Sequence, residues 1–223
     1  MTIYVGDKKI SSKSEVSVIP SLSYKDYIEG NLEHLVLPNY ISKLKFACFR
    51  YYPLKNITFN NIITEIPGKC FEQCPNLESV FIPKNIEIIE DYAFRNCPKL
   101  QYVEFEKNSP ITTLSCCFYG CESLTQIVNI PQGIQEFAPY EFIGCESLES
   151  IEIPQSLTVI STVAFAYCKS LTEITIPSSI EGMGNEVFYG CTNLKTITIN
   201  KPQDSISGAP WGATNATVVW NGW

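Results

Sequence analysis

The sequence predicts an α/β fold, a right-handed solenoid with one long parallel β-sheet, short helical turns and few long helices. Two observations support this prediction: a phrase F-x-x-C-x-x-L recurs, and alternating apolar residues follow each copy; the 45% of hydrophobic residues among the 223 is an ordinary globular balance that argues against disorder. Self-similarity at a fixed short period indicates stacked units that are too small to fold alone. The six copies, 23 or 24 residues apart, begin at Phe71, Phe94, Phe118, Phe142, Phe165 and Phe188.

The strand of each unit follows the leucine of the phrase. In the clearest copy, Leu171, Ile174 and Ile176 form the pattern L-x-x-I-x-I, in which alternate residues enter the core. This pattern is typical of a leucine-rich repeat strand. Pro177 ends the strand because proline cannot donate a hydrogen bond to a neighbouring strand. Parallel strands joined by crossovers are almost always right-handed, so we expect that hand.

A returning arm and a corner complete each unit. After Pro177, we expect Ile180 and Met183 to point inward, and Val187 and Phe188 to begin a short helical turn. A unit buries roughly eight apolar side chains, worth about 1.5–3 kcal/mol each. Ordering the backbone of its roughly 23 residues costs about 1–2 kcal/mol apiece. A single unit is therefore unstable, and only a stack of units is expected to fold.

Six of the ten cysteines occupy one position of the repeat, so equivalent thiols should lie about 5 Å apart in neighbouring strands. Parallel Cβ vectors in such a ladder disfavour disulfides. We expect free, buried thiols that donate weak hydrogen bonds to turn carbonyls. The six cysteines are Cys74, Cys97, Cys121, Cys145, Cys168 and Cys191.

Zinc is the alternative for the cysteines. Cys70 and Cys74, and likewise Cys117 and Cys121, have C-x3-C spacing. Against zinc, His34 is the only histidine, and the period already explains most of the cysteines. Cys70 and Cys117 precede the repeated phenylalanine, where small core residues stand in other copies. We therefore expect no metal and no cofactor.

The frame A/C-F-x-x-C-x-x-L-x-x-I-x-I-P-x-x-I-x-x-I resembles the BspA-like leucine-rich repeats. The resemblance covers about residues 32–200, with local departures. One copy has Tyr52 at the cysteine position, the first copy is degenerate around Leu32 and Pro38, and one extra residue predicts a bulge near Val128. The resemblance implies an adhesion or protein-interaction module at the cell surface or secreted, without catalytic residues.

We expect three segments: an N-terminal cap over residues 1–30, a solenoid of about seven to eight repeats over residues 31–200, and a C-terminal cap over residues 201–223. A hairpin is expected around Gly6-Asp7. The last segment breaks the repeat, contains a short predicted strand ATVVW and holds all three tryptophans, which we expect to cover the last coil. The alternative is a carbohydrate-binding platform. The tryptophans are Trp211, Trp220 and Trp223.

Composition argues against several partners. The net charge of −7, without a Lys/Arg cluster, disfavours nucleic acid and anionic membrane surfaces. Apolar runs are too short for a membrane span. Residues 1–7 lack the pattern of a secretion signal, so either the protein stays inside the cell or a leader was removed.

No catalytic motif is present, and we predict that the chain is not an enzyme. His34 has no paired acid or nucleophile at a suitable spacing and is expected on the exposed face. Phosphate loops, nucleophile elbows and H-E-x-x-H motifs are missing. Asn56-Ile57-Thr58 and Asn215-Ala216-Thr217 are glycosylation sequons that matter only in a eukaryotic secretory route.

The remaining candidate site is the face formed by outward strand residues. Phe81 beside Tyr102, next to Glu104, is the most interface-like cluster, since aromatic residues are enriched at binding sites. We expect a monomeric, adhesin-like module that binds a protein or glycan there. The alternative is a passive spacer or subunit of a larger assembly, with a solvated ladder on this face. The candidate ligand-binding residues are Phe81, Tyr102, Glu104, Gln126, Glu152 and Glu173.

Overall fold

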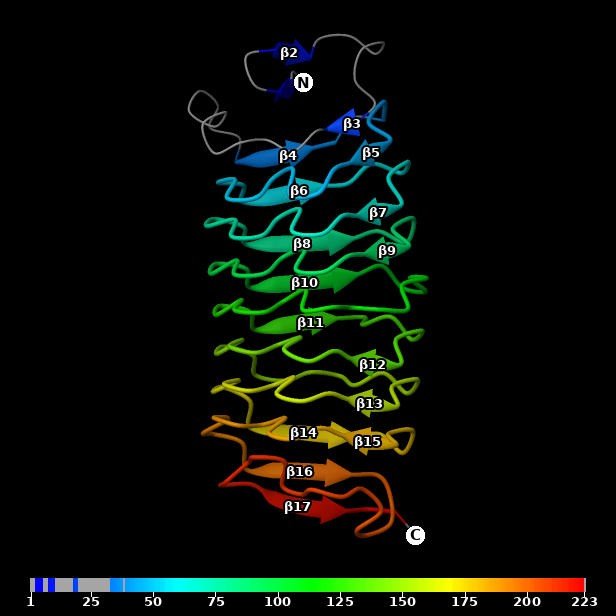
Figure 1. Ribbon diagram of the computed structural model, residues 1–223, viewed down its shortest axis with the longest axis vertical. Coiled ribbons are helices and arrows are strands. Elements are labelled where there is room, and N and C mark those ends of the chain that lie inside the picture. Colours follow the sequence, from blue (N-terminus) through cyan, green and yellow to red (C-terminus); the bar gives the residue numbers. More distant parts are fainter. Residues whose placement is uncertain (1–2, 6–7, 11–17, 20–32, 38, 223) are drawn as a thin grey trace.

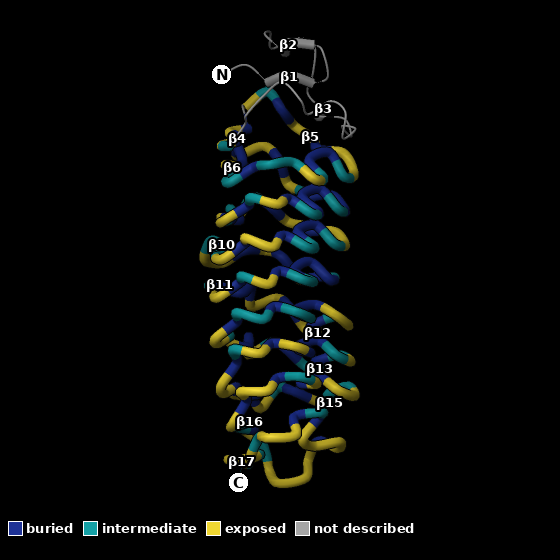
Figure 2. Tube along the Cα trace, turned by 90° about the vertical axis from the view of Figure 1, so that its left-hand side faces the viewer, coloured by how far each residue is buried: buried dark blue, intermediate teal, exposed yellow. Residues whose placement is uncertain are grey.

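The computed structural model is an elongated parallel β-solenoid of about eight turns (Figure 1). It describes residues 3–5, 8–10, 18–19, 33–37 and 39–222. Buried residues line the inside of the coil along its whole length (Figure 2). Several sequence expectations fall on Leu32, Pro38, Trp223 and most of residues 1–30, which lie outside the described residues.

The predicted strands lie on one side of the coil and are parallel. Five form one sheet in the order β11-β10-β8-β6-β4, and three form a second in the order β14-β16-β17. Neighbouring strands pair in register, one coil apart, as the repeat predicts. The strands are β4 (His34–Val36), β6 (Asn56–Thr58), β8 (Ser79–Ile82), β10 (Tyr102–Phe105), β11 (Gln126–Val128), β14 (Glu173–Ile176), β16 (Thr196–Ile199) and β17 (Thr217–Trp220).

The expected single long sheet is interrupted between β11 and β14, where residues 150–153 form no strand (Figure 1). The extra residue predicted near Val128 explains the break. It leaves Asn129 in a left-handed conformation, with φ of 57°, directly after β11. Such an insertion bends the backbone and disrupts pairing locally. The next coil therefore follows β11 without continuing its ladder.

Shorter strands pair on the returning arm, again in parallel. A bridge between Leu114 and Phe137 adds to this arm. In the N-terminal segment, β1 (Ile3–Val5) and β2 (Lys8–Ile10) are antiparallel on either side of Gly6-Asp7, in agreement with the expected hairpin. The arm strands are β3 (Val18–Ile19), β5 (Lys43–Leu44), β7 (Glu65–Ile66), β9 (Ile88–Ile89), β12 (Glu136–Phe137), β13 (Val159–Ile160) and β15 (Gly182–Met183).

The expected short helical turns are wrong, because the described residues contain no helix. At the corner around Phe71, the N–H groups of Lys69, Phe71 and Gln73 donate to carbonyls of the following coil at 2.8–3.0 Å. Alternate amides are thus used between coils and cannot form an i→i−4 ladder. Lys69 and Gln73 are also left-handed, with φ of 57° and 58°. The described part likewise has no helix long and apolar enough to cross a bilayer.

Left-handed residues recur two positions before and two positions after the corner phenylalanine. Both torsions are outside the right-handed helical region, so each corner is a pair of tight turns. The other pairs are Ala47 and Tyr51, Tyr92 and Asn96, Cys116 and Gly120, Tyr140 and Gly144, Val163 and Tyr167, and Glu186 and Gly190.

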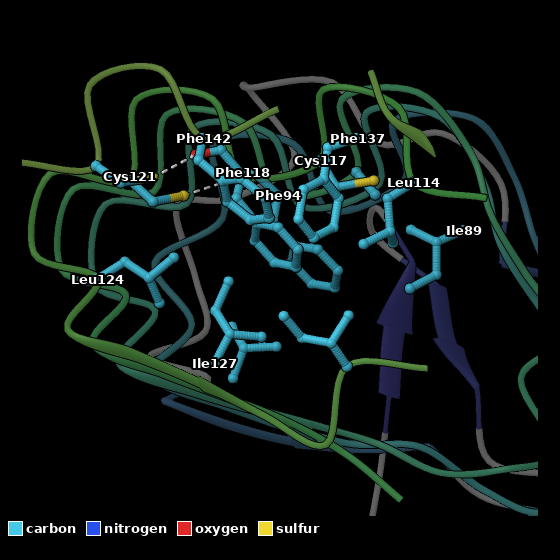
Figure 3. Packing of buried hydrophobic residues seen from close by; sticks show 14 of the residues in the cluster. Ile89, Phe94, Leu114, Cys117, Phe118, Cys121, Leu124, Ile127, Phe137 and Phe142 are labelled. Carbon is cyan, nitrogen blue, oxygen red and sulfur yellow. Dashed lines mark hydrogen bonds between the residues drawn. The ribbon is translucent and has the colours of Figure 1, made fainter. Parts of the chain in front are cut away.

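The repeated phenylalanines stack through the centre of the solenoid (Figure 3). Neighbouring ring centroids lie 5.1–6.0 Å apart with interplanar angles of 2–21°. Figure 3 shows Leu124 and Ile127 of the strand side across the core from this stack. Since every inward ring gains a neighbour above and below, burial grows with each added coil. The stacked rings are Phe49, Phe71, Phe94, Phe118, Phe142, Phe165 and Phe188.

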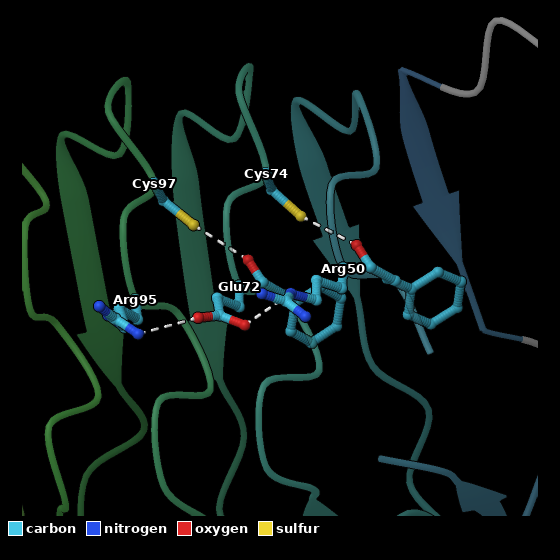
Figure 4. A network of polar contacts seen from close by, with 7 residues as sticks. Arg50, Glu72, Cys74, Arg95 and Cys97 are labelled. Carbon is cyan, nitrogen blue, oxygen red and sulfur yellow. Dashed lines mark hydrogen bonds and ion pairs between the residues drawn. The ribbon is translucent and has the colours of Figure 1, made fainter. Parts of the chain in front are cut away.

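Each cysteine of the repeat donates its thiol to the carbonyl of the phenylalanine one coil earlier, at 3.0–3.3 Å. Figure 4 shows this for Cys74 and Cys97. All ten cysteines are free and buried, as expected. Burial raises the pKa of the Cys145 thiol well above its ordinary 9.0, so it stays protonated and remains a donor.

The tail adds one further coil. β17 pairs in parallel with β16 and confirms the strand predicted at ATVVW. The Phe188 N–H donates to the Trp211 carbonyl at 2.9 Å, and the Trp211 side chain is buried. Trp220 is half-buried against the core, with 6.5 Å between the two indole centroids. The arrangement of these two indoles resembles a cap more than an exposed platform.

Replacing Cys145 tests the thiol ladder. Cys145→Ser keeps a hydrogen-bond donor for the Phe118 carbonyl and should cost about 1–2 kcal/mol of unfolding free energy. Cys145→Asp places a carboxyl group in the fully buried stack and should cost about 3 kcal/mol or more. Denaturant unfolding of both variants and the parent measures these costs. Equal stability of the two variants would contradict the buried ladder.

Deleting residues 201–223 tests the tail as a cap. The deletion exposes the apolar side chains of the previous coil, including Phe188 and Ile197, and leaves the β16 edge unpaired. We expect aggregation or a markedly lower melting temperature, measured by size-exclusion chromatography and thermal unfolding. Trp211→Ala, a milder change, should destabilise in the same direction. A soluble, fully stable truncated monomer would contradict the cap.

Candidate functional site

The outward side chains on the strand side of the coil, including those of residues 150 and 152 where the ladder is interrupted, form a surface here called the strand face. Inward residues such as Val80 and Val103 are buried, while their neighbours in sequence point outward, so the predicted strand register is confirmed. His34 lies on this face and is exposed, as expected. The strand face consists of His34, Val36, Asn56, Thr58, Ser79, Phe81, Tyr102, Glu104, Gln126, Val128, Ser150, Glu152, Glu173, Thr175, Thr196, Thr198, Thr217 and Val219.

Four of the six candidate residues come together on adjacent strands. In the register of β8 and β10, Phe81 lies opposite Glu104, and Tyr102 lies diagonally beside Phe81. Gln126 of β11 lies opposite Tyr102 on the other side. The Phe81 side chain is 47% exposed although it is apolar. The structure thus presents an aromatic and acidic cluster that faces solvent.

Tyr102 and Glu104 are linked within the cluster. The Tyr102 hydroxyl donates to Glu104 Oε2 at 3.1 Å. Partial loss of hydration raises the pKa of Tyr102, and its hydrogen bond to Glu104 raises it further. The phenol therefore stays protonated at neutral pH. The cluster thus holds an acceptor-rich carboxylate beside two aromatic rings.

The other two candidates, Glu152 and Glu173, form a separate group. They line a shallow hollow together with Ser150 and Thr175, over the apolar floor of Ile151 and Ile174. The hollow lies where the strand ladder is interrupted. Three coils separate Glu152 from Phe81, or roughly 14 Å at the usual strand spacing. The acidic stripe is therefore distinct from the aromatic cluster.

Polar side chains at the first strands bind one another. Asn56 Nδ2 lies 3.1 Å from His34 Nδ1, and the Ser79 hydroxyl donates to Asn56 Oδ1 at 2.9 Å. These contacts use up part of the hydrogen-bonding capacity of this region. The side chains of His34, Asn56 and Ser79 therefore resemble an ordinary solvated sheet surface. The Phe81 cluster differs because it leaves an apolar ring exposed.

A buried ion-pair network went unpredicted. The Glu72 carboxylate is fully buried, with Arg50 Nε at 2.6 Å and Arg95 Nη1 at 3.3 Å (Figure 4). These three residues stand directly after the corner phenylalanine of successive coils. An alignment of the copies shows the signal, because the residue after the phenylalanine is basic, acidic and basic in three successive copies. Because the charges are paired across coils, the network joins three coils at the corner.

Glu141 is the second residue that was missed. It occupies the core position where Cys117 and Ala164 stand in neighbouring copies, and it is fully buried. Its Oε1 accepts the Cys117 backbone N–H at 3.0 Å, while Oε2 has no hydrogen-bond partner. Burial raises the Glu141 pKa from an ordinary 4.5 to about 8. The carboxyl group is thus mostly neutral inside the stack at pH 7.

The described residues offer no candidate metal centre. Among them, no three His, Cys, Asp or Glu side chains come close enough to hold a metal ion. The strand face has exposed carboxylates, amides and rings, but no nucleophile beside a base.

The sequence matches a known family. The family described as BspA type leucine rich repeat region matches in six copies, over residues 17–127 and 111–212. No curated protein matches the chain.

Solved bacterial structures are similar to the chain. A leucine-rich repeat protein from Bacteroides ovatus is 25% identical, with a TM-score of 0.67 over 86% of this chain and 54% of that one. A leucine rich cell surface protein from Faecalibacterium prausnitzii is 26% identical, with a TM-score of 0.52 over 76% and 48%. A T. pallidum leucine-rich repeat protein, 22% identical, shares the fold with a TM-score of 0.50 over 92% and 73%. The chain thus spans about half the length of the first and the second of these proteins.

Glu141→Gln tests the buried carboxyl group. Above pH 4.5 the unfolded chain loses a proton that the folded chain keeps up to about pH 8, so stability falls as pH rises through this window. At about 1.4 kcal/mol per pH unit, the loss is on the order of 4–5 kcal/mol. The variant should gain a few kcal/mol over the parent at pH 8 and little at pH 4.5.

Denaturant unfolding across this pH range measures the effect. The matched control is Glu149→Gln, which makes the same substitution at an exposed side chain. If the difference between Glu141→Gln and the parent were independent of pH, Glu141 would not be the titrating group.

Proposed function

This chain belongs to the BspA-type leucine-rich repeat family, and from that premise we propose that it is a non-catalytic, adhesin-like module that binds a protein or glycan through the strand face. The observation that supports the proposal best is the exposed ring of Phe81 beside Tyr102 and Glu104. The strand register leaves no core for this ring to fill, so its exposure is a cost that binding can offset.

The geometry of the solenoid supports a macromolecular ligand. Parallel strands present their side chains in stripes along an extended surface, because the strands follow one another along one side of the coil (Figure 1). A central cluster with aromatic rings and a hydrogen-bonding carboxylate is typical of interface hot spots. Gln126, and further along Glu152 and Glu173, then supply polar contacts at the edge of the interface. We expect the module to bind as a monomer.

A location at the cell surface is part of this proposal. The similar protein from Faecalibacterium prausnitzii is described as a leucine rich cell surface protein. An adhesin-like role requires such exposure. The chain spans only about half of that protein, so a ligand of the full-length relative could bind outside the part that the two proteins share.

Binding experiments on the intact chain provide the test. A glycan array and a protein pull-down should identify a ligand, for which Phe81→Ala and Tyr102→Ala should each weaken binding by about 1–2 kcal/mol, or roughly 5–30-fold in Kd. Melting temperatures should change little, because both side chains lie on the surface.

The matched control is Ile88→Ala, which removes an equally exposed apolar side chain from β9 on the returning arm. Binding should be unchanged in this variant. Loss of melting temperature without loss of affinity in the two strand-face variants would contradict the site. Failure to find any ligand would favour a passive spacer or assembly subunit.

A further inference from the structure

Tyrosines gather at the corners of the solenoid, away from the strand face. Six of the twelve tyrosines in the chain stand within two positions of a stacked phenylalanine. Their side chains leave the coil at the two left-handed positions or directly after the phenylalanine. They are Tyr51, Tyr92, Tyr119, Tyr140, Tyr167 and Tyr189.

In the first coils, cations of the chain itself cover these rings. The Arg95 guanidinium lies 5.2 Å from the Tyr92 centroid and 4.7 Å from the Tyr119 centroid. Lys69 Nζ lies 5.8 Å from the Tyr92 centroid. These are cation–π distances, in which a positive charge is attracted to the negative face of a ring. The corner tyrosines of the early coils thus bind guanidinium and ammonium groups of the chain itself.

In the later coils the rings remain but the cations do not. Tyr140, Tyr167 and Tyr189 are 48%, 42% and 47% exposed. At the position of Arg95, the following coils have Ile143 and Ala166 in place of a base. Within the described part of the chain, no Lys or Arg lies over these three rings.

Tyr167 and Tyr189 are held in place before any partner arrives. Their ring centroids lie 5.4 Å apart in an edge-to-face arrangement. The Tyr167 ring lies over Gly190, where a Cβ would come within 2.6 Å of it, so this position needs glycine. Rigid rings lose little entropy when they bind, which favours their use as anchors.

The charge around these rings suits a cationic partner. Glu186 is exposed on the same corner, three residues before Tyr189. Lys169, a nearby base, is already paired with Glu146 at 2.6 Å. The whole chain carries a net charge of −7, which attracts positive segments from a distance.

We propose that Tyr140, Tyr167 and Tyr189, here called the tyrosine edge, form a second docking surface that binds an arginine-rich segment of a partner polypeptide. The three residues lie in consecutive coils, about 10 Å apart along the axis from first to last, with Tyr140 before the corner phenylalanine and the other two after it. Guanidinium groups of the partner stack on the rings as Arg95 stacks on Tyr92 and Tyr119. This surface is independent of the strand face.

The probe for this surface is a fluorescent peptide, acetyl-Gly-Arg-Gly-Arg-Gly-Arg-Gly, titrated with the intact chain at about 150 mM salt. We expect saturable binding by fluorescence anisotropy. Tyr140→Leu combined with Tyr189→Leu should weaken it about three- to tenfold, whereas the same two positions changed to Phe should retain it. No substitution alters the charge, so non-specific attraction is equal in all variants. Tyr167 is left unchanged because it packs on Gly190.

The control is Phe81→Ala, which removes an equally exposed ring from the strand face and should leave peptide binding unchanged. This variant also separates failure of the tyrosine edge from failure of the strand face. Absence of saturable binding by the parent would overturn the proposal, and so would equal binding by the Leu variant. If the Phe variant binds as weakly as the Leu variant, the hydroxyl groups are the recognised feature. That result would overturn the stacking of guanidinium groups on the rings.

Discussion

The bond from each cysteine thiol to the preceding phenylalanine carbonyl is the interaction on which the rest of the solenoid depends. Most of these carbonyls already accept the backbone N–H of the residue three positions later, as Phe118 accepts from Cys121, so the thiol adds a second donor that comes from the next coil. A thiol is small, weakly polar and protonated in this environment. It ties each corner to the next coil inside the core, on the same side as the stacked phenyl rings.

The chain divides its chemistry between different sides of one scaffold. Glu72 with its two arginines joins the early coils at the corner, while the later corners have tyrosines and glycines. The strand face has carboxylates, amides and the ring of Phe81. Since the core positions are the same in nearly every coil, differences between coils lie almost entirely outside it. A solenoid can therefore acquire a new surface without altering its packing.

Most of the architecture could be predicted from the sequence because the period relates equivalent residues directly. The strand register, the free cysteines and the outward position of Phe81 all follow from it. The apolar pattern could not exclude short helical turns at the corners. The turns are set by left-handed torsions at residues such as Lys69, and such torsions do not change the spacing of apolar residues. Glu141 could not be predicted as buried from the consensus of the repeat. The consensus expects a small apolar residue at this position, and Glu141 is the one carboxyl group that departs from it.

The gap between β11 and β14 divides the strand ladder into two blocks of unequal length. The returning arm and the phenylalanine stack continue across this gap, so neighbouring coils stay coupled there through the core. Local opening would therefore be confined to the strand side, where amides of residues 150–153 should exchange faster than those of the flanking strands. The single inserted residue at Asn129 thus loosens one side of the rod without dividing it.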